Sequence, residues 1–399
     1  MIKKVLIFNH ESYNQLMCTL VEGLKVHKHL ELHSTTKTNY SSDIVIKSQQ
    51  SYEVEVTRTP DGAPAYPVVS SNPIDEEDYV DECEELMDEC DLIIIADNNH
   101  TFSTAYFKNK DKQMESHLHE YATANHKHKI AFLDLISTHY MHDKYTMYGN
   151  YVGGQPVYSK VYFKREKDLD LEWPDNVVPF ARAAEERYFA GGKNFEQIWG
   201  GKVLDVAAVF RSGGDLGREE IKKIIKKHYG KNKKCNVELV FDGQTRRRGA
   251  VFNVVDDRVR DIDKRIYGFE NNELDGTIHH HYSYYNTLLK TKISVECPQY
   301  SGWGFYTYRM WESIANGCCY FYPTPNYNVD FPNGLVDGED FIIYYSPDEL
   351  IEKIEYYLSH EDEMRTIAEN GFNKLLKYHT SEVRAKEFIE TCERYMSEN

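Results

Sequence analysis

The sequence predicts an α/β protein with two doubly wound domains, in each of which helices cover both faces of a parallel sheet. A chain of 399 residues is long for one hydrophobic core, so two domains are expected. Continuous apolar runs such as LIIIA at 92–96 are typical of strands that are buried on both faces. Such runs alternate with helical patterns along the chain, which is the order expected of parallel strands joined by helices.

The first half shows this alternation with one interruption. Alternating segments around the turn signal Asp61-Gly62 predict a β-hairpin insertion. The acidic segment 75–91 carries apolar residues at helical spacing and therefore predicts a surface helix. The other predicted strands and helices of this half are 3–9, 13–27, 90–97, 111–126 and 129–135.

The second half repeats the pattern, and one of its helices has clear start signals. Ser346 is predicted to be an N-cap, with Pro347 at the first helical position and Glu349 closing a capping box. Two Gly-Gly pairs bracket residues 195–200, so we predict an N-terminal domain at 1–197 and a C-terminal domain at 198–399. The other predicted elements of this half are 202–210, 218–230, 236–241, 292–297, 307–316, 318–323, 360–378 and 382–396.

Composition narrows the class of protein. The formal net charge of −17 disfavours a partner that is bound chiefly through phosphates. Eight scattered cysteines without a C-x-x-C pair indicate a reduced, cytoplasmic protein. No apolar run is long enough to cross a bilayer, and MIKKVLIFNH at 1–10 is expected to be a buried strand instead of a signal peptide.

Two loops of the second half are candidate ligand sites, because ligands bind at the carboxyl ends of strands in such sheets. In FRSGGDLGREE at 210–220, Gly213 and Gly214 could let backbone N–H groups approach an anion, and Arg211 adds a positive charge. A plain strand-to-helix turn is the alternative interpretation.

The second loop, 298–317, leads into a helix that carries an unexpected carboxylate. Arg309, Glu312 and Asn316 fall on one face of that helix, and Gly317 is the expected terminator. Glu312 could accept hydrogen bonds from both vicinal hydroxyls of a ribose, a task that needs a group with acceptors only. An internal ion pair between Arg309 and Glu312 is the alternative.

These segments carry a family resemblance. YRMWESIANGCCYFYP at 308–323, followed by GLVDGEDFIIYYSPDEL at 334–350, resembles the C-terminal domain of GT-B glycosyltransferases. It is most similar to the family-1-like branch with spore-maturation-type proteins, and the resemblance covers about residues 282–390. The resemblance implies two Rossmann-like domains that face each other across a cleft, and a sugar transferred from a nucleotide diphosphate.

The resemblance also implies roles for single residues. Glu312 would bind the ribose of the sugar nucleotide, and Arg309 would lie beside the diphosphate or the donor sugar. Tyr282 and Lys292 match a pattern that lines the donor cleft. Many retaining members have a second glutamate where this chain has Gly304, so retaining chemistry is not implied.

The reaction is expected to need neither a metal nor a cofactor, with the nucleotide sugar as substrate. GT-B enzymes stabilise the leaving group with helix N-termini and cationic side chains, a role that suits Arg211 and Lys292. The D-x-D matches are expected by chance in a chain with 64 acidic residues, and HHH at 279–281 has no matching set of ligands, so we assign no metal. An inverting base would come from strand ends of the first domain, where ordinary polar caps are the alternative. The candidates are His10, Glu11, Asp97, His100 and Asp134.

The acceptor is expected to be a glycan or another polymer with hydroxyl groups. The tyrosine-rich segment 145–163 could stack on sugar rings. The basic residues within 222–248 keep DNA with hydroxymethylated pyrimidines as the alternative acceptor. Two further alternatives are a nucleotide-sugar epimerase and a non-catalytic nucleotide-sugar-binding or scaffold protein of the same fold.

Overall fold

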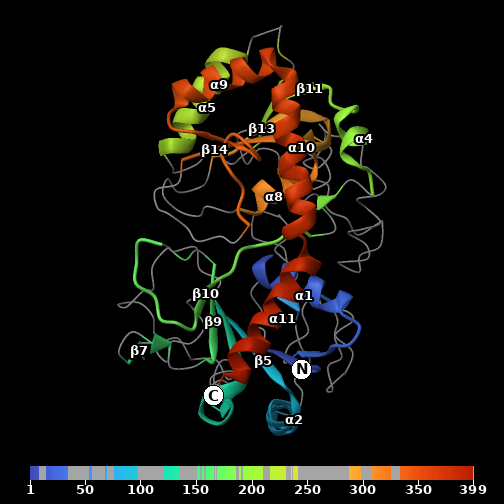
Figure 1. Cartoon of the computed structure of the whole chain (residues 1–399), viewed down its shortest axis with the longest axis vertical. Helices are drawn as coiled ribbons and strands as arrows, with labels where there is room; N and C mark the ends of the chain where they lie inside the picture. Colours follow the sequence, from blue (N-terminus) through green and yellow to red (C-terminus); the bar gives the residue numbers. More distant parts are fainter. Residues whose placement is uncertain are drawn as a thin grey trace.

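The computed structural model contains two parallel sheets, which lie one above the other in Figure 1. The residues that it describes are 1–8, 15–34, 54–55, 68–69, 76–97, 118, 121–134, 151–152, 155–156, 159–165, 167, 169–185, 188–189, 192–209, 216–230, 235, 237–240, 287–297, 307–324 and 333–398.

The first sheet has six strands in the order β10-β9-β6-β5-β1-β2, and every neighbouring pair is parallel. The chain first adds β2 on one side of β1 and then adds β5 on the other side, so the order reverses between β1 and β5. The strands are β1 Lys4–Phe8, β2 Glu31–Ser34, β5 Leu92–Asp97, β6 Ile130–Asp134, β9 Val161–Lys164 and β10 Val177–Pro179.

The second sheet has five parallel strands in the order β12-β11-β13-β14-β15. Here the order reverses between β11 and β13. The strands are β11 Leu204–Val209, β12 Val237–Val240, β13 Thr291–Val295, β14 Cys319–Pro323 and β15 Ile342–Tyr344. Both sheets therefore have the doubly wound topology that the sequence predicts.

Most predicted helices are confirmed within one or two residues at each end. Two short strands on either side of the predicted turn, β3 and β4, pair in antiparallel fashion. The helices are α1 Gln15–Val26, α2 Glu76–Glu89, η1 Lys127–Lys129, α4 Phe195–Trp199, α5 Leu216–Tyr229, α8 Tyr308–Ala315, α9 Pro347–Ser359, α10 Glu361–Tyr378 and α11 Ser381–Ser397. The short antiparallel strands are β3 Val54–Glu55, β4 Val68–Val69, β7 Tyr151–Val152 and β8 Gln155–Pro156. No described helix has both the length and the low polarity that a membrane crossing requires.

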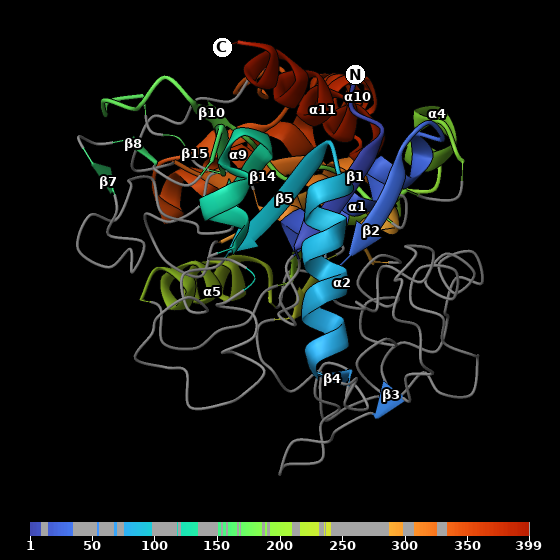
Figure 2. The same cartoon turned by 90° about the horizontal axis from the view of Figure 1, so that it is seen from below.

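Helices cover both faces of the first sheet, as Figure 2 shows from below. Leu6, Ile93 and Ile95 share a core cluster with residues of α2. Their neighbours Val5 and Ile94 belong to a different cluster, which contains residues of α1 and α11. Because successive side chains of a strand point to opposite faces, the two clusters lie on opposite sides of the sheet.

The final helix leaves the second sheet and packs on the first, and the chain crosses between the halves in two adjacent segments (Figure 1). Gly23 of α1 permits a close approach, because a Cβ there would lie 2.0 Å from the carbonyl oxygen of Ser381. Ala184 N–H donates to His379 O at 2.7 Å, and Ser381 N–H donates to Ala184 O at 3.0 Å. The two crossings are therefore hydrogen-bonded to each other.

The exact domain boundary at 197/198 stays a prediction. Helix α4 spans this position, and its Phe195 and Ile198 pack in the core of the second sheet.

Candidate functional site

The reversal of strand order between β11 and β13 marks the place where doubly wound sheets bind ligands, at the carboxyl ends of these two strands. Helix α5 follows β11 and α8 follows β13, so both helices begin at this edge. Residues at the start of α8 and at the ends of the two strands therefore make up the candidate site.

Helix α8 begins and ends where the sequence predicts. Thr307 is its N-cap, with the side-chain oxygen accepting from Met310 N–H at 3.4 Å. Gly317 has φ of +67°, the left-handed conformation that a helix terminator needs. The glycine is also required by space, because a Cβ there would lie 2.8 Å from Ile198 Cγ2.

Arg309 reaches from α8 to the carboxyl end of β11. Its Nη1 donates to the backbone oxygen of Val209, the last residue of β11, at 2.9 Å. The side chain is only partly buried. The guanidinium thus stands at the carboxyl end of β11, beside the reversal of strand order.

Glu312 lies one turn further along α8 and is only 2% exposed, unlike a glutamate on a surface helix. The neighbouring Trp311 stacks on His379, with the ring centroids 4.8 Å apart. Ser313 Oγ lies 2.9 Å from Ser294 Oγ, which joins α8 to β13. A buried carboxylate is costly unless hydrogen bonds or charges compensate it.

Asn316, predicted on the same face as Arg309 and Glu312, has a structural role. Its Nδ2 donates to Tyr188 O and to Glu312 O, both at 2.8 Å. Its own backbone oxygen accepts from Lys202 Nζ at 2.5 Å. Burial lowers the pKa of the Lys202 ammonium, which donates to the carbonyl oxygen at the end of α8.

Glu296 is a site residue that the sequence analysis missed. It follows β13 directly, it is 4% exposed, and its Oε2 accepts from Tyr320 OH at 2.5 Å and from Thr307 Oγ1 at 3.1 Å. Burial and then the Glu296 charge raise the pKa of the Tyr320 phenol, so the phenol stays a donor. An acidic residue that ends the apolar strand KISVE at 292–296 was the available signal.

Lys292 is placed differently from the expectation. Its ammonium lies 3.0 Å from Glu361 and 3.7 Å from Asp205, near the amino end of the sheet. The physical reason is register: Lys292 is the second residue of β13, and only residues at the other end of the strand reach the switch point. The structure therefore does not bring Lys292 together with Arg309.

In the first sheet, Asp97 ends β5 and pairs in register with Asp134, which ends β6. Asp134 is 4% exposed, and its Oδ2 accepts from Tyr162 OH and from Lys164 Nζ, each at 2.8 Å. One oxygen of this candidate base is thus occupied by an internal ion pair. For Asp97 the structure describes only the backbone, which lies at the carboxyl edge of the sheet.

The remaining predicted site residues lie outside the residues that the structure describes. They are His10, Glu11, His100, Arg211, Gly213, Gly214, Tyr282 and Gly304. The HHH segment at 279–281 also lies outside. Within the described ranges, no cluster of three or more His, Cys, Asp or Glu side chains could hold a metal ion.

Comparisons with known proteins agree with this fold. Residues 246–390 match the family model described as "Glycosyl transferase-like", and no curated protein matches the sequence. A glycosyltransferase from Rickettsia africae ESF-5 is similar over 100% of both chains, with 12% identity and a TM-score of 0.57. Anabaena Alr3699/HepE in complex with UDP covers 98% of this chain and 100% of its own, with 9% identity and a TM-score of 0.55.

Sucrose-phosphate synthase from Thermosynechococcus elongatus is also similar over 100% of both chains, with 9% identity and a TM-score of 0.53. At such low identities the structural similarity shows the fold alone. The family model adds that residues 246–390 are similar to a glycosyl transferase-like domain. The spore-maturation-type branch stays a prediction. The chain therefore has the GT-B fold of these structures, and its residues 246–390 are similar to a glycosyl transferase-like domain.

Proposed function

We propose that the protein transfers a sugar from a nucleotide diphosphate to a hydroxyl group of a glycan or another polymer. The observation that carries the proposal is the buried carboxylate of Glu312 on α8, one turn after Arg309 at the end of β11. The structure of Alr3699/HepE with UDP shows that a protein of similar fold binds this nucleotide, which supports the class of donor.

In this proposal the two side chains of α8 divide the donor between them. Glu312 accepts hydrogen bonds from the two ribose hydroxyls, because a carboxylate offers acceptors to both. Arg309 faces the diphosphate, where its fixed charge stabilises the departing nucleotide. Arg211 and the glycines at 213 and 214 precede α5 and would add a cation and backbone N–H groups on the other side.

The catalytic base is proposed to come from the first sheet. His10, Glu11 and His100 follow β1 and β5 in the sequence, and the first sheet reverses its order between these two strands. Asp97 ends β5 at the same edge. Asp134 would have to act beside its ion pair with Lys164 and its hydrogen bond from Tyr162.

We propose that the transfer needs no metal, because helix N-termini and arginine can stabilise a leaving diphosphate. The proposal also places the reaction in the reducing cytoplasm, in agreement with the scattered cysteines. Activity that survives EDTA and gains nothing from Mg²⁺ or Mn²⁺ is the expected result. Activity that EDTA abolishes and Mn²⁺ restores would refute the metal-free mechanism.

The decisive test of the site is Glu312→Gln. The amide replaces one acceptor oxygen with a donor, so one ribose hydroxyl loses its partner. Calorimetric titration with UDP, GDP and ADP should show affinity for the preferred nucleotide reduced about ten- to a hundredfold, which corresponds to roughly 1.5–3 kcal/mol. The melting temperature should change little, because Met310, Trp311 and Ile314 hold α8 through apolar packing.

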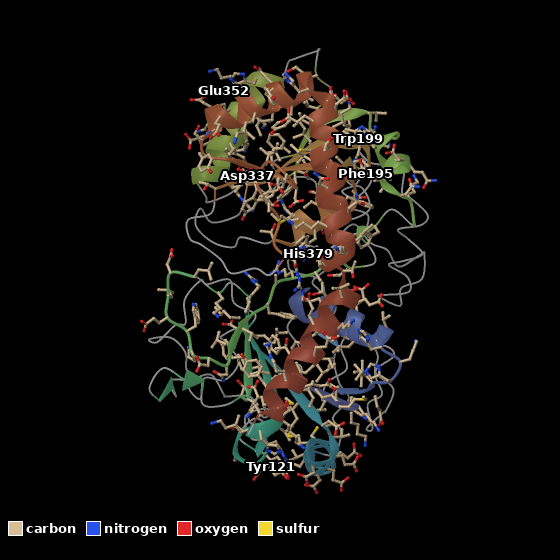
Figure 3. The ribbon with its side chains drawn as sticks, viewed as in Figure 1. Tyr121, Phe195, Trp199, Asp337, Glu352 and His379 are labelled. Carbon is tan, nitrogen blue, oxygen red and sulfur yellow. The ribbon has the colours of Figure 1, made fainter. Side chains whose placement is uncertain are left out.

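The matched control is Glu352→Gln on α9, an exposed glutamate (Figure 3). This variant should bind nucleotide like the wild type. Unchanged nucleotide affinity in Glu312→Gln would show that the carboxylate is structural and would remove the site assignment.

A panel of UDP-, GDP- and ADP-sugars distinguishes the possible activities. Slow hydrolysis of one donor is the result expected of a transferase without its acceptor. An isomerised donor would instead identify an epimerase, and the absence of both turnover and binding would identify a scaffold protein.

The acceptor is tested by binding. A neutral glycan should bind with little dependence on salt. The described part of α5 exposes Lys223, Lys226 and Lys227, which is the feature that favours DNA. Binding to hydroxymethylated DNA that falls steeply with salt would show that phosphate contacts dominate and would replace the glycan.

A further inference from the structure

Glu296 is held by two neighbouring strands of the second sheet, β14 and β15. Its Oε2 accepts from Tyr320 of β14, and its backbone oxygen accepts from Tyr344 OH of β15 at 2.8 Å. Its backbone N–H donates to Phe321 O at 3.0 Å. These bonds fix the end of β13. A further bond, from Thr307 Oγ1 to the same carboxylate, links Glu296 to α8.

The Thr307 hydroxyl takes part in two hydrogen bonds with opposite roles. A hydroxyl has one proton to donate, and this proton is directed to Glu296 Oε2 at 3.1 Å. The lone pairs of the same oxygen are then directed to Met310 N–H. The carboxylate therefore orients the N-cap, and through the N-cap it fixes where the first turn of α8 lies.

The helix that follows has little stability of its own. Helix α8 has only 8 residues, and isolated helices of this length are unstable in water. Its position depends on contacts with the rest of the domain. Arg309 lies in the turn that Thr307 caps, and Glu312 lies one turn later.

A buried carboxylate is an expensive way to cap a helix if packing is its only purpose. The charge of Glu296 must be removed from water, and neutral residues at this position would avoid that cost. The hydrogen bond that it accepts from Thr307 is charge-assisted and therefore stronger than a bond to a neutral acceptor. Such a bond suits a place where the start of a helix must be held in one position.

We infer that Glu296 is a positioning residue of the donor site, which holds Arg309 and Glu312 in place through the Thr307 hydroxyl. The inference rests on the proposed function, since it assigns Glu296 to the binding of the same nucleotide. It needs no contact between Glu296 and the substrate. The carboxylate is required as an acceptor of hydrogen bonds, and its negative charge is not required to meet the ligand.

The test combines two removals with two conservative changes. Glu296→Ala and Thr307→Ala should each weaken UDP binding about tenfold, and the double variant should be no weaker than the worse single variant. Glu296→Gln keeps an acceptor oxygen and Thr307→Ser keeps the hydroxyl, so both should stay within about threefold of the wild type.

Hydrogen exchange at the Met310 amide gives a readout that does not depend on the ligand. Exchange should be faster in Glu296→Ala and in Thr307→Ala, and it should not increase further in the double variant. If Glu296→Ala does not fold, the contrast between Thr307→Ala and Thr307→Ser carries the same test. A wild type that binds none of UDP, GDP and ADP would overturn the proposed function, while the exchange rates would still decide whether Glu296 holds the helix.

Three results would overturn the inference. One is UDP affinity that is unchanged in Glu296→Ala. Another is losses that add in the double variant, because independent effects would exclude an action through Thr307. The third is a loss in Glu296→Gln as large as that in Glu296→Ala, which would indicate direct contact between the charge and the ligand.

Discussion

Two buried carboxylates stand at the carboxyl ends of strands, one in each sheet, and their surroundings invite comparison. Asp134 ends β6 and Glu296 follows β13, and each is 4% exposed. Each accepts through a single oxygen from a tyrosine of the next strand, Tyr162 at 2.8 Å in the first sheet and Tyr320 at 2.5 Å in the second. Sequence position and burial alone would not distinguish them.

The second donor is what differs. Asp134 faces the ammonium of Lys164, which is fully buried, whereas Glu296 faces the hydroxyl of Thr307. The ion pair cancels two charges inside the first domain and ties β6 to β9. The hydroxyl cancels no charge, and it connects Glu296 to the helix that carries the candidate site. The hydrogen-bond partner, more than the carboxylate itself, therefore separates a structural role from a positioning role.

The largest effect is expected for Lys164→Met. This change leaves the Asp134 carboxylate buried beside an apolar side chain, so we expect the free energy of unfolding to fall by about 3–5 kcal/mol. Urea denaturation followed by circular dichroism measures the change. Adding Asp134→Asn should recover part of the loss, because the stranded charge is then removed.

The matched control for this prediction is Lys386→Met, since that lysine is 65% exposed and lies 3.9 Å from Glu390. It should change stability by less than about 0.5 kcal/mol. A loss below about 1 kcal/mol in Lys164→Met would show that the ion pair is not a main support of the first sheet.

Stability should also depend on pH, and one buried histidine, His379, contributes to this dependence beside the carboxylates. His379 lies between the two halves of the molecule (Figure 3). Its Nδ1 faces Arg384 Nη2 at 3.1 Å and must accept, since arginine only donates, so Nε2 carries the proton toward Asn333 O at 2.9 Å. Burial, and then the charge of Arg384, lower the pKa of His379 to about 3.

The sign of the effect follows from proton binding. The unfolded chain protonates His379 near pH 6.5 and the folded chain only near pH 3, so the unfolded state binds more protons between these values. Stability should therefore fall by about 2 kcal/mol from pH 8 to pH 5 through this group. Urea titrations across this range should show a flatter profile for His379→Gln. An equally steep profile in the variant would assign the acid sensitivity to other groups.

The sequence was sufficient for the elements with strong local signals. Ser346 and Pro347 start α9, and Gly317 ends α8, as their chemistry predicts. It was not sufficient for side chains whose partners are distant in the chain. Glu296 was missed because its role depends on Tyr320. Lys292 was assigned to the donor site by the family resemblance, although it lies at the start of its strand.

The smallest predicted difference is between two variants that each remove one hydroxyl group, one in each sheet. Tyr320→Phe removes a donor from Glu296, whose other described donor is the Thr307 hydroxyl, and should cost about 1.5–3 kcal/mol. Tyr162→Phe leaves Asp134 with the ammonium of Lys164, so its cost should be only about 1 kcal/mol. Both rings are at least 90% buried and keep their packing as phenylalanine, so the difference reports the hydrogen bonds. Urea denaturation of the two variants side by side measures that difference. Equal losses would show that a lysine and a threonine support the two carboxylates equally well, and the distinction between the two roles would then be lost.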